Sequence, residues 1–171
     1  MPFDDQAFFS VWYWLLTAVF WSMVTFFTHG VPWDLLRRAL RHGGEEAEIC
    51  DRYARACLIR IDAGVARWGA VSAAIIGFVL AAMAVMGLVA RSELALGLLL
   101  MVGPGALMFA LQCAEARRLA PHLPQLAPEQ LLELLLRRRA ANRLLGMFAV
   151  TLSVGLLGWL NLDRIVIQGG W

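Results

Sequence analysis

The chain has 171 residues, of which 60% are hydrophobic and 16% are charged, and its formal net charge is +2. This length allows one domain, and the apolar segments occupy so much of it that little chain is left for a separate soluble domain. A charge balance so near neutrality gives no indication of a nucleic-acid partner, and none is expected.

Four stretches contain no Asp, Glu or Arg: residues 6–33, 68–90, 94–114 and 144–162. A water-soluble helix needs a polar face, whereas an apolar run of about 18 or more residues leaves none and predicts a membrane span. We therefore predict an all-α, polytopic membrane protein with four transmembrane helices and amphipathic cytoplasmic helical extensions. The single membrane domain, 1–171, is predicted to have spans at 7–29, 67–90, 94–114 and 143–162, and cytoplasmic connections at 30–66 and 115–142.

The 15 basic residues are all arginines, and they are unevenly distributed. Seven lie between the first two apolar stretches and six between the last two, whereas only Arg91 and Arg164 lie elsewhere. Because positive residues are retained in the cytoplasm, both long connections are predicted there and both termini on the opposite side. Asp4 and Asp5 argue against a cleaved signal peptide, so the first span is expected to be retained.

The first span is rich in aromatic residues at both ends. Amphipathic rings favour the headgroup level, so these two clusters are expected to mark the two membrane interfaces. Phe20 and Trp21 lie at mid-span, where they either face lipid, pack within the protein or contact another subunit. The candidate interface aromatics are Trp12, Trp14, Phe20 and Trp21.

The first connection is predicted to contain two helices. Asp34 is the expected N-cap of a short helix that ends at Gly43 and Gly44. Glu45 then opens a second helix, because negative charge suits a helix N-terminus. One stripe of this helix is apolar at every fourth position: Ile49, Tyr53, Cys57 and Ile61. No proline interrupts it, so it is expected to continue into the second span.

Small residues recur at four-residue spacing in the second span: Gly69, Ala73, Gly77 and Ala81. Such a stripe lets another helix approach closely, which is how helices associate in lipid. A three-residue turn leads into the third span, so the two spans are predicted to form an antiparallel hairpin. Near the middle of the third span lie Gly103, Pro104 and Gly105, where the proline removes a helix hydrogen bond and predicts a kink.

The second connection begins with the proline-rich segment 121–128, which is predicted to be a loop. A helix is then expected to begin at Pro128 and to continue into the fourth span. Its leucine-rich start is followed directly by a basic cluster, namely Arg137, Arg138 and Arg139. This is typical of a membrane-surface helix whose arginines contact anionic lipid head groups or a partner. A basic flank is also what the topology rule requires by itself.

The apolar stretches lack the ionisable residues that proton and ion transport use. Motifs of nucleophilic, metalloprotease and phosphate-binding sites are also absent, so neither an enzyme nor a cofactor is expected. Cys50, Cys57 and Cys113 fall in or beside the cytoplasmic region, where thiols stay reduced. A metal or redox site that uses Cys50, Cys57 and a histidine is an open alternative.

Further features come early in the chain: Trp12-Tyr13-Trp14, Trp21-Ser22, Gly30-Val31-Pro32 and the Arg-rich segment that ends at Gly43-Gly44. In these features the chain resembles an uncharacterised family of alphaproteobacterial four-span membrane proteins, sometimes labelled as a component of the Suf iron–sulfur assembly complex. The resemblance is clearest over the first third and continues through the span count and Asn161-Leu162. It implies a multi-pass protein of the bacterial inner membrane, with periplasmic termini, and supplies no catalytic residue.

A chain rich in packing surfaces and without recognisable chemistry predicts a non-catalytic accessory or assembly subunit of an inner-membrane complex. Its expected partners are the lipid bilayer and other membrane subunits or a second copy of itself. The alternative is a small-molecule or lipid carrier, as a homo-oligomer, in which the kinked third span and the hydroxyl groups of the first span line a pathway.

Overall fold

The computed structural model describes residues 11–168, with side chains described as far as Leu156. Its elements in chain order are α1 (Val11–Phe26), β1 (Phe27–Thr28), β2 (Val31–Pro32), α2 (Trp33–His42), α3 (Gly44–Leu88), α4 (Glu93–Leu119), the 3₁₀ helix η2 (Ala120–Gln125) and α5 (Pro128–Gln168). Apart from one hairpin, whose two strands have two residues each, and the short turns, the described chain is helical. The predicted all-α class is therefore confirmed.

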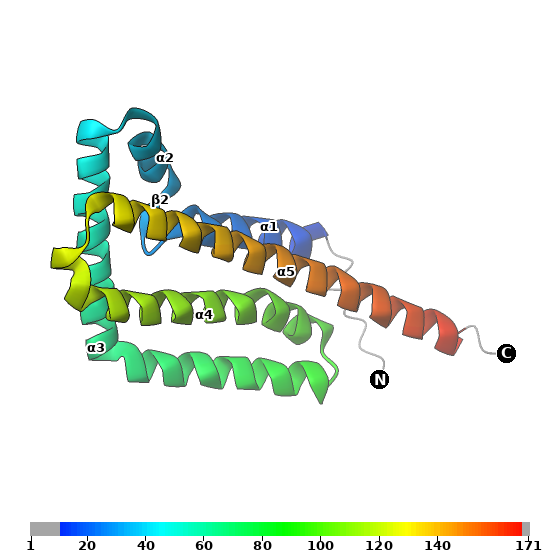
Figure 1. Cartoon of the computed structure of the whole chain (residues 1–171). Helices are drawn as coiled ribbons and strands as arrows, with labels where there is room; N and C mark the ends of the chain where they lie inside the picture. The colour runs from blue at the N-terminus through cyan, green and yellow to red at the C-terminus, as the bar shows by residue number, and fades with distance from the viewer. Residues whose placement is uncertain (1–10, 169–171) are drawn as a thin grey trace.

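Four helical segments lie side by side in Figure 1: α1, the second half of α3, α4 and α5. Near its middle α3 turns sharply, so its first half crosses the end of this bundle together with α2 and η2. The turn between α3 and α4 lies at the other end, near the start of α1, and α5 extends beyond this level. The hydroxyl of Tyr13 in α1 donates to the carbonyl of Gly97 in α4 over 3.2 Å, which ties α1 to the bundle.

Two helical segments in the described part of the chain are long and apolar enough to cross a membrane. They are Gly44–Leu88 and Glu93–Gln125, which contain the predicted second and third spans. The predicted first span, 7–29, ends earlier than predicted, because the backbone leaves the helix at Phe27. The described part of this helix, α1, has 16 residues. Residues 7–10 lie outside the described part.

The predicted fourth span, 143–162, lies within α5, which begins in the second connection at Pro128 and continues without a break, as predicted. Its side chains after Leu156 are outside the described residues, as are Asn161 and Arg164. Over the described residues the structure therefore gives two membrane-length apolar helices where the sequence predicts four spans.

The second half of α3 exposes apolar side chains. In its most apolar segment only 6% of the residues are buried, whereas the core helix of a water-soluble protein is mostly buried. Large exposed side chains on this half include Trp68, Val71, Ile75, Phe78 and Val85. Such a surface indicates association with a membrane, because large contiguous apolar patches are rare on soluble monomers.

The hairpin of β1 and β2 was not predicted. Its two central residues, His29 and Gly30, have φ values of +51° and +79°, and a tight hairpin turn of this kind needs positive φ at both positions. Because β2 ends in an extended Pro32, α2 begins at Trp33, and Pro32 occupies the N-cap position. The prediction of Asp34 as N-cap is therefore wrong, and Asp34 lies in the first turn.

The predicted loop 121–128 is also partly wrong, because residues 121–125 belong to η2. Leu123 is buried in a hydrophobic cluster beneath the first half of α3. Arg55 of α3 donates to the carbonyls of Leu123 and Leu126, the latter over 2.7 Å, and is itself held by Asp51 at 2.7 Å. These contacts satisfy carbonyl groups at the end of the 3₁₀ turn and fix the proline-rich segment.

Candidate membrane-interface site

The hairpin carries a buried histidine to the junction of α4 and α5. Thr28 and His29 are both 0% exposed. The main-chain N–H of His29 donates to the side-chain oxygen of Gln112 in α4 over 2.9 Å. Its imidazole Nε2 lies 3.2 Å from Oε2 of Glu115, an ion-pair distance without hydrogen-bond geometry. One hydrogen bond and one electrostatic contact thus fix the hairpin turn to α4.

Glu115 lies one residue past the apolar stretch of the third predicted span. This residue of α4 contacts both the β1–β2 hairpin and α5. The Nε of Arg138 in α5 lies 3.1 Å from the same Oε2 that faces His29. The contact with His29 is the main cause that lowers the pKa of Glu115; burial opposes it, and the charge of Arg138 adds to the lowering. Glu115 therefore carries a negative charge at neutral pH and balances the arginine beside it.

Arg139 binds the main chain at the end of α1. Its Nη1 donates to the carbonyls of Thr25 and Phe26, over 3.1 Å and 3.3 Å. Its guanidinium carbon also lies 4.1 Å from the ring centroid of Trp33, a cation–π distance. The last carbonyls of a helix have no partner within that helix, so a buried arginine at this position both satisfies them and suits the negative end of the helix dipole.

The predicted basic cluster therefore does not form one surface. Arg137 is exposed and pairs with Glu133 over 2.6 Å. Arg138 is mostly buried against Glu115, and Arg139 is 7% exposed. Of these three side chains, Arg137 is the one placed to meet a lipid head group or a partner.

A groove of about 810 Å³ lies between the second half of α3 and α4. It is lined by Gly69, Ala73 and Gly77 of the predicted small-residue stripe, whereas Ala81 is not part of its wall. Gly103 of α4 lines the opposite wall. A Cβ added at Gly64, Gly77 or Gly103 would meet no atom within 4 Å, so at these levels the small residues border open space.

The aromatic residues of α1 divide between the interior and the surface. Trp21 is 7% exposed, and its ring lies 3.1 Å from where a Cβ of Gly146 in α5 would be. The ring of Phe20 lies 2.9 Å from the corresponding position at Gly105 in α4. Trp14 is half-buried and Trp12 is exposed. Phe20 and Trp21 therefore pack within the chain.

The third predicted span remains one helix across its proline. α4 is continuous over Gly103, Pro104 and Gly105. The two glycines have different surroundings, because Gly103 borders the groove and Gly105 receives the ring of Phe20. This segment thus allows α1 to approach α4 on one side while the groove stays open on the other.

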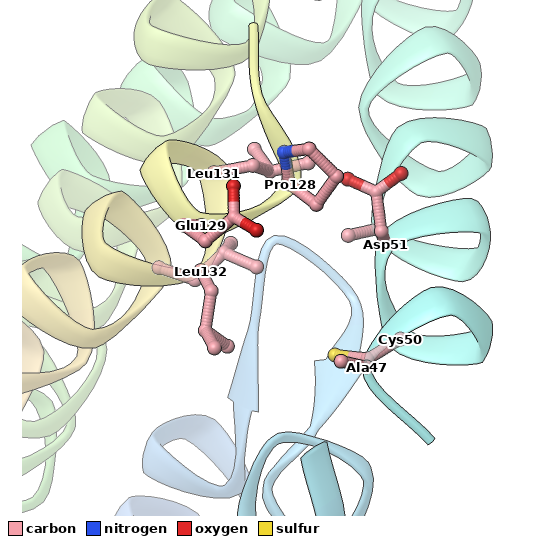
Figure 2. A pocket seen from close by; sticks show the side chains of 9 residues that line it. Ala47, Cys50, Asp51, Pro128, Glu129, Leu131 and Leu132 are labelled. Carbon is pink, nitrogen blue, oxygen red and sulfur yellow. The ribbon is translucent and has the colours of Figure 1, made fainter. Parts of the chain in front are cut away.

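The three cysteines are free thiols in different environments. Cys50 and Cys57 are buried side chains of the first half of α3, and Cys113 is half-buried in the groove. A smaller cavity of about 60 Å³ is lined by Cys50 and Asp51 of α3 and by Pro128 and Glu129 of α5. Figure 2 shows the side chains that line it. Within the described residues, no three His, Cys, Asp or Glu side chains are grouped so as to hold a metal ion.

Replacement of Arg139 tests its role at the end of α1. We expect Arg139→Ala to lower the free energy of unfolding by roughly 2–3 kcal/mol, because charged hydrogen bonds to two carbonyls are lost. The main-chain amides of 27–31 should also exchange faster with deuterium. The matched control is Arg137→Ala, which removes an exposed ion pair and should cost at most about 1 kcal/mol. Equal losses in the two variants would contradict this role.

Neither a protein-family model, nor a curated protein, nor a solved structure matches the chain. The function is therefore inferred from the residues and contacts of the chain itself.

Proposed function

We propose that the chain is a non-catalytic protein of the bacterial inner membrane that spans the bilayer four times and serves as an accessory or assembly subunit of a membrane complex. The observation that carries this proposal is the outward-facing apolar surface of α3. In the most apolar segment of this helix, only 6% of the residues are buried. Exposure of apolar surface to water costs roughly 25 cal/mol per Å². Lipid or another membrane protein is therefore the expected cover.

The arrangement of the helices supports four spans. α1, the second half of α3, α4 and α5 lie side by side, and the connections that carry most of the arginines lie at one end (Figure 1). At this end the chain leaves the helical conformation in the β1–β2 hairpin. Non-helical backbone is tolerated at the edge of the hydrocarbon only where protein groups satisfy it, and Gln112 and Arg139 supply such groups.

The exposed face of α3 supports an assembly role. The spacings of this row are three, four, three and seven residues, which correspond to the apolar positions of a heptad: Trp68, Val71, Ile75, Phe78 and Val85. Such a row suits the spanning helix of a partner. The bacterial location is proposed from the sequence features near the start of the chain alone. No feature of the described residues points to a reaction.

The groove favours a second function, the carriage of a lipid or a small apolar molecule. Its volume of about 810 Å³ falls within the range of roughly 300–1,000 Å³ that is common for ligand sites. A carrier differs from an assembly subunit in that its ligand exchanges between membranes or leaflets. Transfer of labelled phospholipid between vesicles would separate the two functions.

The proposed orientation predicts the labelling of two single-cysteine sites. An impermeant maleimide added to intact cells should label Arg91→Cys in the outer turn, and Gln125→Cys only after permeabilisation. Both positions are exposed, and the unsubstituted chain, with two buried cysteines and one half-buried, is the control. Labelling of Gln125→Cys alone in intact cells would reverse the orientation.

The assembly role predicts a stable complex in mild detergent after cross-linking. Replacement of Ile75 and Phe78 by Ala should weaken recovery of that complex by about tenfold or more, because central apolar anchors dominate interfaces. Leu144 and Phe148, which are exposed on α5, provide the matched control pair. A strictly monomeric protein without a co-purifying partner would contradict the assembly role.

A further inference from the structure

The geometry points to a binding site for one phospholipid of the inner leaflet in the groove between α3 and α4, with its acyl chains along the small residues and an anionic head group at Arg117. This inference rests on the proposed membrane location and orientation. It is independent of any partner subunit.

The shape of the groove selects an occupant that enters from the cytoplasmic side. At the outer end the helices close, since a Cβ added at Gly87 would lie 3.1 Å from Cα of Leu96. From Gly103 to Arg117 the α4 wall is about 21 Å long at the helical rise. One leaflet contributes about 15 Å of hydrocarbon, whereas a spanning helix must cross about 30 Å. Acyl chains of one leaflet therefore fit, and a full transmembrane helix is blocked by the closed end.

The walls of the groove are apolar and are not filled by the protein itself. Beside the glycines they present Val65, Ile76, Leu80 and Leu107, and Ser72 is a small polar exception. A void without partner atoms forfeits dispersion contacts on both walls. In hydrocarbon the flexible chains of a lipid are the available material that can fill so irregular a space.

Charge at the mouth of the groove selects the head group. Arg117 lines the groove and has a side chain that is 59% exposed. Its nearest carboxylate, Asp62, lies 3.9 Å away and is also exposed, so this ion pair is weak. The guanidinium thus remains available for two parallel hydrogen bonds to a phosphate. Arg117 is the one charged side chain among the described residues that line the groove, and Asp62 is not part of the wall. The groove thus presents positive charge to the head group, which favours a net negative head group over a zwitterionic one.

Cys113 provides a native reporter, since it is half-buried and lines the groove, whereas the other two cysteines are buried. The protein is placed at one copy per nanodisc, in phosphatidylcholine alone or with phosphatidylglycerol, and reacted with a permeant maleimide. We expect alkylation of Cys113 to be about fivefold slower with phosphatidylglycerol than in phosphatidylcholine alone. This factor is about the gain in affinity that corresponds to the attraction of one arginine to an anionic surface. Arg117→Gln should abolish the difference, and Asp62→Asn should enlarge it.

Three controls separate groove occupancy from a general surface-potential effect. Arg137→Gln removes an exposed charge elsewhere on the cytoplasmic side and should leave the difference intact. Ala74→Cys in a Cys113→Ser background places the thiol on the exposed side of α3, outside the groove wall, and should show no lipid dependence beyond surface potential. Gly77→Leu fills open space in the groove and should remove the lipid dependence, whereas Ala74→Leu should not.

Equal alkylation of wild-type Cys113 in both lipids would overturn the inference, and so would a difference that survives Arg117→Gln. Protection that appears only at two copies per disc would mean that a second chain fills the groove, which also overturns it. Correct labelling of Arg91→Cys and Gln125→Cys together with a lipid-independent Cys113 would reject the groove site while leaving the proposed membrane location standing.

Discussion

Main-chain polar groups cannot remain unpaired where hydrocarbon replaces water, and under the proposed membrane location this constraint governs the end of the bundle that carries the β1–β2 hairpin. α1 ends at Phe26, and the chain must turn back within a few residues. The carbonyls at the end of α1 accept hydrogen bonds from Arg139, and the N–H of His29 finds Gln112. Glu115 then balances Arg138. Side chains from α4 and α5 thus make the non-helical turn possible at this depth.

The same end of the molecule determines how α3 is used. Its first half packs with α2, η2 and α5 around buried leucines, and Arg55 secures η2 through carbonyl contacts. Its second half lies beside α4 (Figure 1). Many of the apolar side chains of this half are exposed. Because the two helices meet closely at Gly87 and separate toward Arg117, the groove results from the divergence of the hairpin.

Much of the helical framework is predictable from local sequence signals. The absence of proline after Glu45 predicts the long α3, and Gly43, with φ of +60°, ends α2 as expected. The hairpin was missed because its first central residue is His29, whereas Asn or Asp is the usual signal. Helical geometry also explains why the basic cluster does not form one surface. Successive residues of a helix point about 100° apart, so Arg137 and Arg139 face different surroundings. The partners of Arg139 lie over 110 positions earlier in the chain, beyond the reach of local patterns.

If the chain spans the bilayer as proposed, hydrocarbon covers the second half of α3. Extraction of cell membranes at alkaline pH is a direct test, because this treatment releases peripheral proteins and leaves integral ones in the pellet. We expect the chain to stay in the pellet and to be released only by detergent. Recovery of a monodisperse chain from the aqueous fraction, without lipid or detergent, would contradict it.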